Sequence, residues 1–327
     1  MKWVESAPSN IAWIKYMGKT DHAQNLPTNI SLSYTVEYLR TTVELELADT
    51  DSWQPLAGVE FYPLDLSDQA KERYLRHLAF LKKQFACEAA FTVRSANNFP
   101  ASCGIASSAS SFAALTRCFA SAIIQMKKGD ANVSVKRLSD LSRQGSGSSC
   151  RSFYSPWSKW DDEGASEEHL PYKDLVHMVV VCGAEEKDVS TSQAHKRVSS
   201  SKLFVGRPER ATQRYHELVS SLKHQAWKSA HAIAWAEFWD MHSLFETSQV
   251  PFGYMNAGSL KVLSAVRRLW TEHGDGPIVT MDAGPNVHLF FRSEQSTLAS
   301  QFAAEMEKYF LVLSRFFKTG VHAVPLS

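Results

Sequence analysis

The sequence lacks the features that mark secreted, membrane-embedded or zinc-stapled proteins. Its 327 residues include five cysteines, an odd and scattered set with no Cys-x-x-Cys pair. That pattern argues against a disulfide framework or a structural zinc site and fits a reducing compartment. The opening residues lack the apolar run of a signal peptide. The longest apolar stretch, Leu175–Cys182, is far shorter than the roughly 20 residues that cross a bilayer. We therefore expect a cytoplasmic protein without a membrane segment.

An excess of charge of one sign is also missing. Lys and Arg together number 35 and Asp and Glu 34. Proteins that bind nucleic acid or membrane surfaces usually carry a basic excess, so neither partner is expected. With 44% hydrophobic and 21% charged residues, the composition is that of a globular protein with a substantial core, in one large domain or two.

Periodicity predicts both helices and strands in each half of the chain. The predicted helices cover 68–84, 107–126, 207–239, 257–272 and 296–316, and the predicted strands cover 41–47, 91–94, 175–182, 278–281 and 287–291. The strand at 175–182 is the best candidate for a buried central strand. Because the elements follow no strict β-α-β rhythm, the pattern favours an α+β fold. A polar stretch after Gly183 predicts a boundary near residue 185, hence domains 1–185 and 186–327.

The serine-rich loop Pro100–Ser111 has the composition of an anion-binding helix start. Gly104 can adopt positive φ and lets a ligand approach the backbone. Ser107 or Ser108 would serve as N-cap, and the unpaired N–H groups of the first turn attract anions. A Walker loop is excluded because no Gly-x-x-x-x-Gly-Lys-Ser/Thr is present. A capped helix after a flexible loop explains the same spacing, so from the residues alone both interpretations stay open.

Three further segments combine residue types suited to chemistry. Ala7–Lys19 places two lysines and a tyrosine around a glycine, although a strand with solvated lysines looks the same. Gly145–Ser152 carries two glycines, serines and Arg151, whose planar guanidinium suits a carboxylate, although a surface loop is the ordinary alternative. Asp282 ends a predicted strand just before a Gly-Pro turn. The Asp-x-Gly-Pro sequence is a common turn signal, and the end of a strand is also a rigid place for a catalytic carboxylate.

Taken in order, these segments resemble a known family. The run Asn97–Ala109 looks like the ATP-phosphate loop of the GHMP kinase superfamily, and the set is most similar to mevalonate diphosphate decarboxylases over roughly residues 6–290. The resemblance implies a two-domain GHMP-kinase-like α+β fold, with an N-terminal domain related to a ribosomal-protein fold and a ferredoxin-like C-terminal domain. It also implies that ATP with Mg²⁺ lies in the cleft between them. We further expect a homodimer, a state that the sequence does not establish.

The resemblance also implies a role for individual residues. Asp282 would be the catalytic carboxylate, Lys15 its supporting cation, and Arg151 the ligand of the substrate carboxylate. The substrate-binding set would be Tyr16, Lys19, Ser146, Ser148 and Arg151. The ATP-binding set would be Asn98, Pro100, Gly104, Ala106, Ser107 and Ser108, with Ser108 also a Mg²⁺ ligand. By the same resemblance, Lys187–Gln193 would help to bind substrate and Met241–Ser243 would serve packing.

The chain departs from the family pattern at three points. Met17 stands where the family has tryptophan, and Ser155-Pro156 replaces a Gly-Gly pair. The arginine that binds the diphosphate in the family has no secure counterpart in the 68–84 helix, where Lys71 or Arg73 would substitute. The phosphate content of the substrate therefore stays open.

The leading hypothesis is an ATP-dependent decarboxylase that converts mevalonate 5-diphosphate to isopentenyl diphosphate. The 3-hydroxyl would be phosphorylated, after which phosphate and CO₂ leave. Alternatives are a decarboxylase of mevalonate 5-phosphate, a GHMP small-molecule kinase without decarboxylation, and a non-catalytic ligand-binding protein of the same fold. The Asp282, Lys15 and Arg151 set favours decarboxylation, because related enzymes that only phosphorylate mevalonate lack it.

Overall fold

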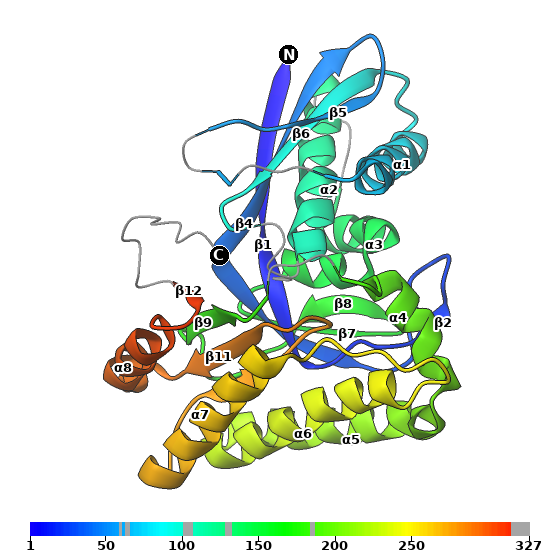
Figure 1. Ribbon diagram of the computed structural model, residues 1–327. Helices are drawn as coiled ribbons and strands as arrows, with labels where there is room; N and C mark the ends of the chain where they lie inside the picture. The colour runs from blue at the N-terminus through cyan, green and yellow to red at the C-terminus, as the bar shows by residue number, and fades with distance from the viewer. Residues whose placement is uncertain (59–60, 63–65, 101–106, 128–132, 184–186, 315–327) are drawn as a thin grey trace.

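A computed structural model describes residues 1–58, 61–62, 66–100, 107–127, 133–183 and 187–314 (Figure 1). Its strands are β1 (Lys2–Ile14), β2 (Lys19–Asp21), β3 (Leu26–Pro27), β4 (Ser31–Ala48), β5 (Ser52–Pro55), β6 (Ala90–Asn97), β7 (Trp157–Asp161), β8 (Gly164–Glu167), β9 (Val176–Val181), β10 (Ile278–Thr280), β11 (Val287–Phe291) and β12 (Leu311–Ser314). Its α-helices are α1 (Asp68–Phe85), α2 (Ser107–Met126), α3 (Val135–Gly145), α4 (Thr191–Arg197), α5 (Arg207–Lys223), α6 (Trp227–Glu246), α7 (Ala257–His273) and α8 (Ser296–Met306). Short 3-10 turns are η2 (Gly147–Phe153), η3 (Val198–Ser200), η4 (Lys202–Phe204) and η5 (Ser293–Gln295).

The first sheet is built around the long strand β4. Its order is β5-β6-β4-β7-β8, and β1 also pairs with β4. The second half of β4 pairs with β6, and its first half pairs with β7. Strand β1 runs antiparallel to β4 from the pair Lys2↔Glu46 to the pair Ile14↔Leu32. Because β1 is buried over most of its length, it carries the chain from the surface into the interior just before Lys15.

Helices α1, α2 and α3 cover one side of this sheet (Figure 1). The spacing of apolar residues predicted α1 and α2, and the structure confirms both, with α1 one residue longer than expected. One face of α2 is buried along the helix, from Ala109 to Ile123. Phe119, for example, packs with Phe91 of β6 and Phe85 of α1.

The second sheet is antiparallel in the order β10-β11-β9-β12. Strand β9 confirms the predicted buried central strand, since every residue in it is buried. Alternate side chains point to opposite faces. Val176, Met178 and Val180 pack with residues of α7 and α8, whereas Val179 and Val181 join a core shared with β1, β4 and α5. The second sheet therefore packs directly against the first.

Aromatic side chains fill this shared core. The ring centroid of Trp13, on β1, lies 4.7 Å from that of Trp157 and 5.0 Å from that of Phe290. Tyr34 packs edge-on to both Trp157 and Phe290. Large rings that bury this much apolar area stabilise a fixed relation between the two sheets.

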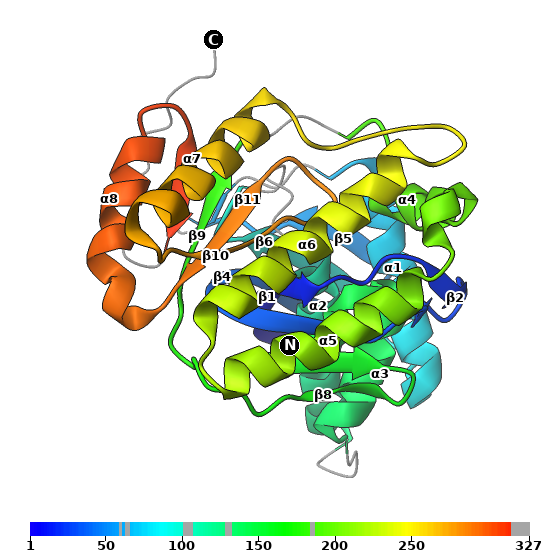
Figure 2. The same ribbon diagram turned by 90° about the horizontal axis from the view of Figure 1, so that it is seen from below.

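Two predicted helices were wrong in extent. The predicted helix 207–239 is two helices, α5 and α6, which are separated at 224–226 and lie side by side (Figure 2). The break occurs where Gln225 takes positive φ and the Trp227 indole donates to the carbonyl of Gly276. The predicted helix 296–316 ends at Met306, and β12 then pairs with β9. In both places tertiary contacts override local helix preference.

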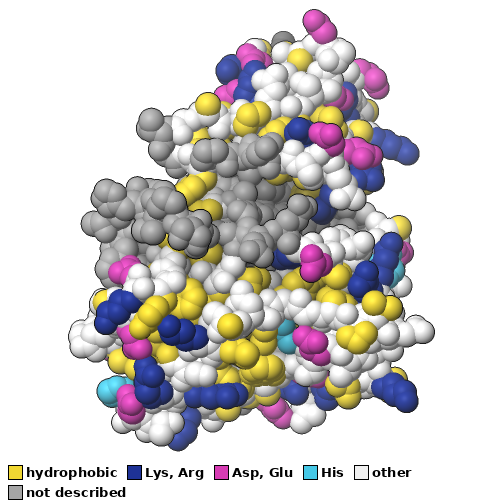
Figure 3. Space-filling view, in the orientation of Figure 1, with side chains coloured by type: hydrophobic (Ala, Val, Ile, Leu, Met, Phe, Trp, Pro, Cys, Tyr) yellow, Lys and Arg dark blue, Asp and Glu magenta, His cyan; other side chains and the backbone are white. Residues whose placement is uncertain are grey.

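The two-domain α+β class is confirmed, but the position of the boundary stays a prediction. Residue 185 lies outside the described residues, and β9, which precedes it, already belongs to the second sheet. No helix in the described part of the chain is long and apolar enough to cross a membrane. On the face shown in Figure 3, basic and acidic side chains are interspersed over the described residues, in keeping with the net charge of +1.

Candidate active site

The central feature of the site is an ion pair between residues 267 positions apart. Lys15 Nζ lies 2.7 Å from Asp282 Oδ1. The lysine side chain is 2% exposed and the aspartate side chain 28% exposed. Lys15 directly follows β1 in the first sheet, and Asp282 lies between β10 and β11 in the second. The packing of one sheet on the other therefore creates this pair.

The pair keeps the Asp282 carboxylate ionised. Burial by itself raises the pKa of Asp282, but the attraction of Lys15, His288 and Arg151 outweighs it, so the net pKa lies below the ordinary value. Burial lowers the pKa of Lys15, and the neighbouring Asp282 opposes that shift. An ionised carboxylate with one edge facing solvent can accept a proton from a bound hydroxyl group.

The backbone around Asp282 is held by side chains from several elements. His242 Nε2, on α6, donates to the carbonyl of Asp282 at 3.1 Å. The Asn286 side chain accepts from the N–H of Cys182 at 2.8 Å, which ties the turn to the end of β9. Thr280 Oγ1 donates to the carbonyl of Ala12 at 3.0 Å, which ties β10 to β1. The packing role expected for the segment around His242 agrees with this contact.

Arg151 lies in η2 and is 3% exposed. Its Nε donates to Asn10 Oδ1 at 3.0 Å and its Nη1 to Ser31 Oγ at 2.6 Å. Its guanidinium also lies 5.6 Å from the ring centroid of Trp160. These neutral partners orient the guanidinium, and no carboxylate of the described residues forms an ion pair with it. Such an arginine is prepared for an anionic group of a ligand.

The glycine-serine motif before Arg151 fits closely around Tyr16. A Cβ on Gly147 would lie 2.7 Å from the Tyr16 hydroxyl oxygen, so only glycine fits there. The Tyr16 hydroxyl is buried and has no hydrogen-bond partner among the described residues. A buried hydroxyl without a partner carries a free-energy penalty that a ligand oxygen would remove.

Cations gather at the same end of the site. Lys19 Nζ donates to Asn25 Oδ1 at 2.6 Å, and burial, with Arg73 and Lys196 nearby, lowers the pKa of Lys19 to about 8. Arg73, on α1, donates to the carbonyl of Gly145 at 3.3 Å. Lys71, the other candidate on this helix, pairs with Asp68 at 3.2 Å and does not line the site. Of the two candidates, only Arg73 lines the cleft.

The amino end of α2 opens into the same space. Ser107 and Ser108 are the first two residues of the helix, and Ser146 Oγ donates to Ser108 Oγ at 3.3 Å. The residue before Ser107 lies outside the described residues, so the N-cap role expected for Ser107 or Ser108 stays a prediction. Gly104 and Ala106 lie outside the described residues.

Asn98 and Pro100 are described but do not line the site. The Asn98 side chain donates to the carbonyl of Tyr38 at 2.8 Å and accepts from the N–H of Arg40. Asn98 therefore fastens the end of β6 to β4.

The ion pair, Arg151, the glycine-serine motif and the amino end of α2 line a cleft of about 310 Å³. Its lining includes all three predicted catalytic residues and every predicted substrate-binding residue: Lys15, Tyr16, Lys19, Ser146, Ser148, Arg151 and Asp282. It also includes Lys187 and the residues 190–192, from the segment expected to bind substrate. Five lysine and arginine side chains line the cleft, and Asp282 is the one acid among its described lining residues. This charge balance suits a ligand with several phosphate groups.

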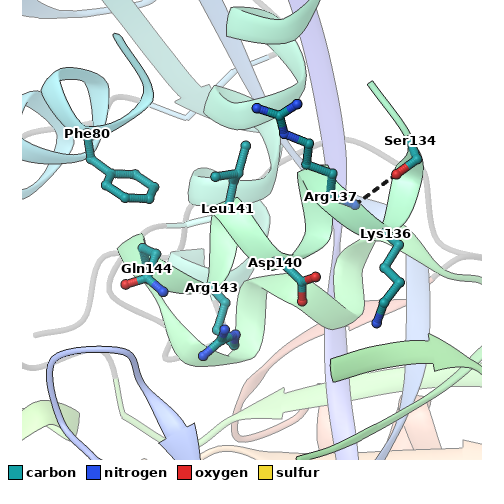
Figure 4. Close-up of a pocket in the computed structure, with 8 residues that line it drawn as sticks. All are labelled: Phe80, Ser134, Lys136, Arg137, Asp140, Leu141, Arg143 and Gln144. Carbon is teal, nitrogen blue, oxygen red and sulfur yellow. Dashed lines mark hydrogen bonds between the residues drawn. The ribbon is translucent and has the colours of Figure 1, made fainter. Parts of the chain in front are cut away.

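A second hollow, of about 430 Å³, lies beside α3 (Figure 4). Its basic side chains do not converge, since Arg137 and Arg143 point in opposite directions (Figure 4). Arg137 stacks on Phe85, Lys136 donates to the carbonyl of Glu163, and Arg143 donates to the carbonyl of Gln24. These charges already have partners within the protein, so the hollow is a weaker candidate than the cleft.

Sequence reasoning missed the residues that hold the charged groups in place. Asn10 and Ser31 fix Arg151, and Asn25 fixes Lys19. His195 packs against the Tyr16 ring and accepts from the N–H of Gly18 at 3.0 Å. Asn10 lies within the opening motif, so its position was a usable signal. Ser31, Asn25 and His195 carry no local pattern that distinguishes them.

Comparisons with known proteins agree with this arrangement. A model of the diphosphomevalonate decarboxylase-like N-terminal domain matches residues 7–171, and a model of the mevalonate 5-diphosphate decarboxylase C-terminal domain matches residues 177–321. The diphosphomevalonate decarboxylase of Eremothecium gossypii is 31% identical, covering 88% of this chain and 77% of its own length.

Solved structures extend the comparison to the fold. The crystal structure of a mevalonate diphosphate decarboxylase from Legionella pneumophila is 46% identical, with a TM-score of 0.90 over 96% of this chain and 100% of its own. Another structure, described as a complex with MVAPP, AMPPCP and magnesium, is 28% identical, with a TM-score of 0.82 over 95% of this chain and 96% of its own. The chain, with its two-part fold and cationic cleft, belongs to the diphosphomevalonate decarboxylase family.

Proposed function

We propose that this chain catalyses the ATP-dependent decarboxylation of mevalonate 5-diphosphate to isopentenyl diphosphate. The observation that carries the proposal is the 2.7 Å pair between Lys15 and Asp282 in a cleft with a strong excess of cations. A binding-only protein has no chemical need for an ionised carboxylate and a buried lysine at the centre of an anion site.

In the first step the oxygen of the substrate 3-hydroxyl group attacks the γ-phosphorus of ATP, and Asp282 accepts the proton of that hydroxyl group. The bond from the γ-phosphorus to the bridging oxygen breaks, and ADP leaves with that electron pair. Lys15 keeps the aspartate ionised and orients it. Positioning of the two oxygens in line supplies much of the rate enhancement in phosphoryl transfer.

In the second step the C3–O bond of the phosphorylated intermediate breaks, and inorganic phosphate leaves with the electron pair of that bond. The electrons of the bond to the carboxylate then form the carbon–carbon double bond, and CO₂ is released. Arg151 would hold that carboxylate, because its guanidinium is buried, oriented by Asn10 and Ser31, and lines the cleft.

The diphosphate tail would lie among Tyr16, Lys19 and Arg73, beside Ser146 and Ser148. The unpartnered Tyr16 hydroxyl and the two neighbouring cations support this orientation. Because Arg73 lines the cleft, we assign to it the role of the arginine that binds the diphosphate in the family. Two cations at this end favour a diphosphate over a monophosphate.

The ATP phosphates would lie at the amino end of α2, where Ser107 and Ser108 line the cleft. Asn98, Pro100, Gly104 and Ala106 stay predicted ATP-binding residues. The site fits a Mg²⁺ ion carried mainly by phosphate oxygens and water, since no cluster of three or more His, Cys, Asp or Glu in the described residues could hold a metal. Ser108 would add one hydroxyl ligand. When bound, the ion neutralises phosphate charge during transfer.

The test is to incubate the purified protein with ATP, Mg²⁺ and mevalonate 5-diphosphate and to measure ADP and CO₂ together. We expect equal amounts of both. ADP without CO₂ would identify a kinase, and neither product with intact binding would identify a ligand-binding protein. A parallel reaction with mevalonate 5-phosphate decides between the two substrates. We also propose a cytoplasmic homodimer, which light scattering of the purified protein and fractionation of its cells would test.

A further inference from the structure

Glu237, on α6, is a fully buried acid that contacts the backbone of Lys15. It is 0% exposed. Its Oε1 accepts from the backbone N–H of Lys15 at 3.0 Å. Its Oε2 accepts from Arg207 Nη1 and from Arg214 Nη1, both at 3.0 Å. The mechanism above gives this residue no task.

The contact with Lys15 replaces a strand hydrogen bond. The antiparallel ladder of β1 ends at the pair Ile14↔Leu32, so Lys15 lies just beyond it. Glu237 accepts from the N–H of Lys15, and Asn29 Nδ2 donates to its carbonyl at 3.0 Å. A backbone held on both sides by buried side chains has few alternative conformations, so the direction of the lysine side chain is fixed.

Arginines pair with Glu237 and hold its side chain in place. Arg207 is 0% exposed and also donates to Asp240, which contacts Arg210 and Arg214 as well. A buried carboxylate is stable only when paired in this way. Asp240 belongs to the same cluster of charges, but among the described residues its side chain contacts the three arginines and not Lys15. The cluster therefore contains one acid that contacts Lys15 and one that serves as its natural control.

We propose that Glu237 is a positioning residue for the reaction, which fixes the backbone of Lys15 so that its ammonium group meets Asp282. The inference rests on the proposed function of that pair. It extends the site to the α5–α6 helix pair, which lies below the end of β1 in Figure 1.

The negative charge of Glu237 also acts on Lys15. It raises the pKa of the lysine against the larger lowering by burial, alongside Asp282, while Arg151 lowers it. His242 and His288 also lie in the electrostatic range of Lys15. Removal of the Glu237 charge should let Lys15 lose its proton at lower pH. The basic limb of the pH profile of kcat would then move to lower pH, an effect that simple loss of stability does not produce.

The test compares Glu237→Gln with Asp240→Asn, since each removes one negative charge from the same arginine cluster. For Glu237→Gln we expect kcat to fall about 10- to 100-fold, as for a slightly misplaced catalytic group. We also expect KM to change little and the basic limb to move down by about one pH unit. For Asp240→Asn we expect kcat within about twofold of the parent, an unmoved limb and a similar loss of Tm.

Glu237→Asp keeps the charge but is one methylene too short to reach the N–H of Lys15, and it carries the test if the glutamine variant does not fold. It should lower kcat with an unmoved basic limb. A kcat within twofold of the parent in the folded Glu237 variants, or an equal loss in Asp240→Asn, would overturn the inference. Lys15→Met is measured in parallel. If it leaves kcat unchanged, the proposed function itself has failed, which separates the two outcomes.

Discussion

Single residues define the chemistry of this protein through their charge and burial. Lys15 and Asp282 form an ion pair with the lysine almost fully buried, and Arg151 is held by neutral partners. The first arrangement keeps a carboxylate ionised, and the second keeps a guanidinium available for a ligand. In the proposed mechanism, accepting a proton and holding a carboxylate are therefore tasks of two different side chains of one cleft.

Asp282→Asn should abolish turnover with only a modest loss of substrate affinity. An amide cannot accept the hydroxyl proton, so we expect kcat to fall about 10²- to 10⁴-fold. ADP release measures turnover, and calorimetry with mevalonate 5-diphosphate measures affinity. Asp49→Asn, an exposed change in the turn after β4, is the control and should behave as the parent. Near-normal turnover in Asp282→Asn would refute the assigned role.

Arg73→Met should weaken binding of the diphosphate. Loss of a charged hydrogen-bond donor to a phosphate costs about 1.5–3 kcal/mol, so KM should rise at least about tenfold. Lys71→Met removes a cation two positions away that pairs with Asp68 outside the cleft. It should change KM by less than about twofold. Steady-state kinetics with mevalonate 5-diphosphate measures both, and equal effects of the two changes would contradict the role of Arg73.

The helices and strands place these residues, and their ends matter most. Strand β1 ends at Ile14, and the turn after β10 contains Asp282, so both partners of the ion pair follow strand ends. The amino end of α2 and the 3-10 turn η2 complete the cleft. Helix α1 contributes Arg73 to the cleft, and the residue that ends this helix, Ala86, adopts a backbone conformation that favours glycine.

Ala86→Gly should stabilise the protein. Ala86 caps α1 in the left-handed region, with φ 47°, and its N–H donates to the carbonyls of Lys82 and Lys83. Glycine has no Cβ to clash there, so we expect a gain of about 0.5–1 kcal/mol in the free energy of unfolding. Ala79→Gly, in the exposed middle of α1, is the control and should lose about 1 kcal/mol. Urea unfolding measures both, and a loss in both variants would contradict the prediction.

Among the described residues, five buried histidines link stability to pH. They are His77, His177, His195, His242 and His288, and burial lowers the pKa of each, for example to about 3 for His77. Their ordinary value is 6.5. Below that pH the unfolded chain binds protons that the folded protein does not. Stability is therefore full above about pH 6.5 and falls as the pH decreases towards the folded pKa values.

His77→Gln should weaken that dependence. His77 joins α1 to α2 through Thr116, at 3.0 Å from Nε2 to Oγ1, and glutamine can retain a hydrogen bond there. Near pH 5 the slope of the free energy of unfolding against pH should fall by up to about 1.4 kcal/mol per unit. Urea unfolding between pH 4.5 and 7.5, values chosen around the ordinary histidine pKa, measures the slope. An unchanged slope would show that His77 is not neutral in the folded protein.

Much of the fold was predictable from local pattern. Periodicity located α1, α2 and β9, because their apolar spacing reflects which faces are buried. It failed at the break between α5 and α6 and at β12, where hydrogen bonds to distant elements decide the conformation. The short motifs around Lys15, Arg151 and Asp282 indicated which residue types form the site, because each motif is a run of particular side chains that are neighbours in the chain.

Tertiary structure alone decided which of those side chains meet. The motifs lie more than a hundred residues apart, and no local rule predicts that Lys15 reaches Asp282 or that Glu237 accepts from the backbone of Lys15. The same holds for the selection of Arg73 over Lys71, because helical spacing places both on α1 but only packing directs one into the cleft. Charge partners across a cleft depend on how two sheets pack, and that packing is set by a core such as the one around Trp13, to which both sheets contribute.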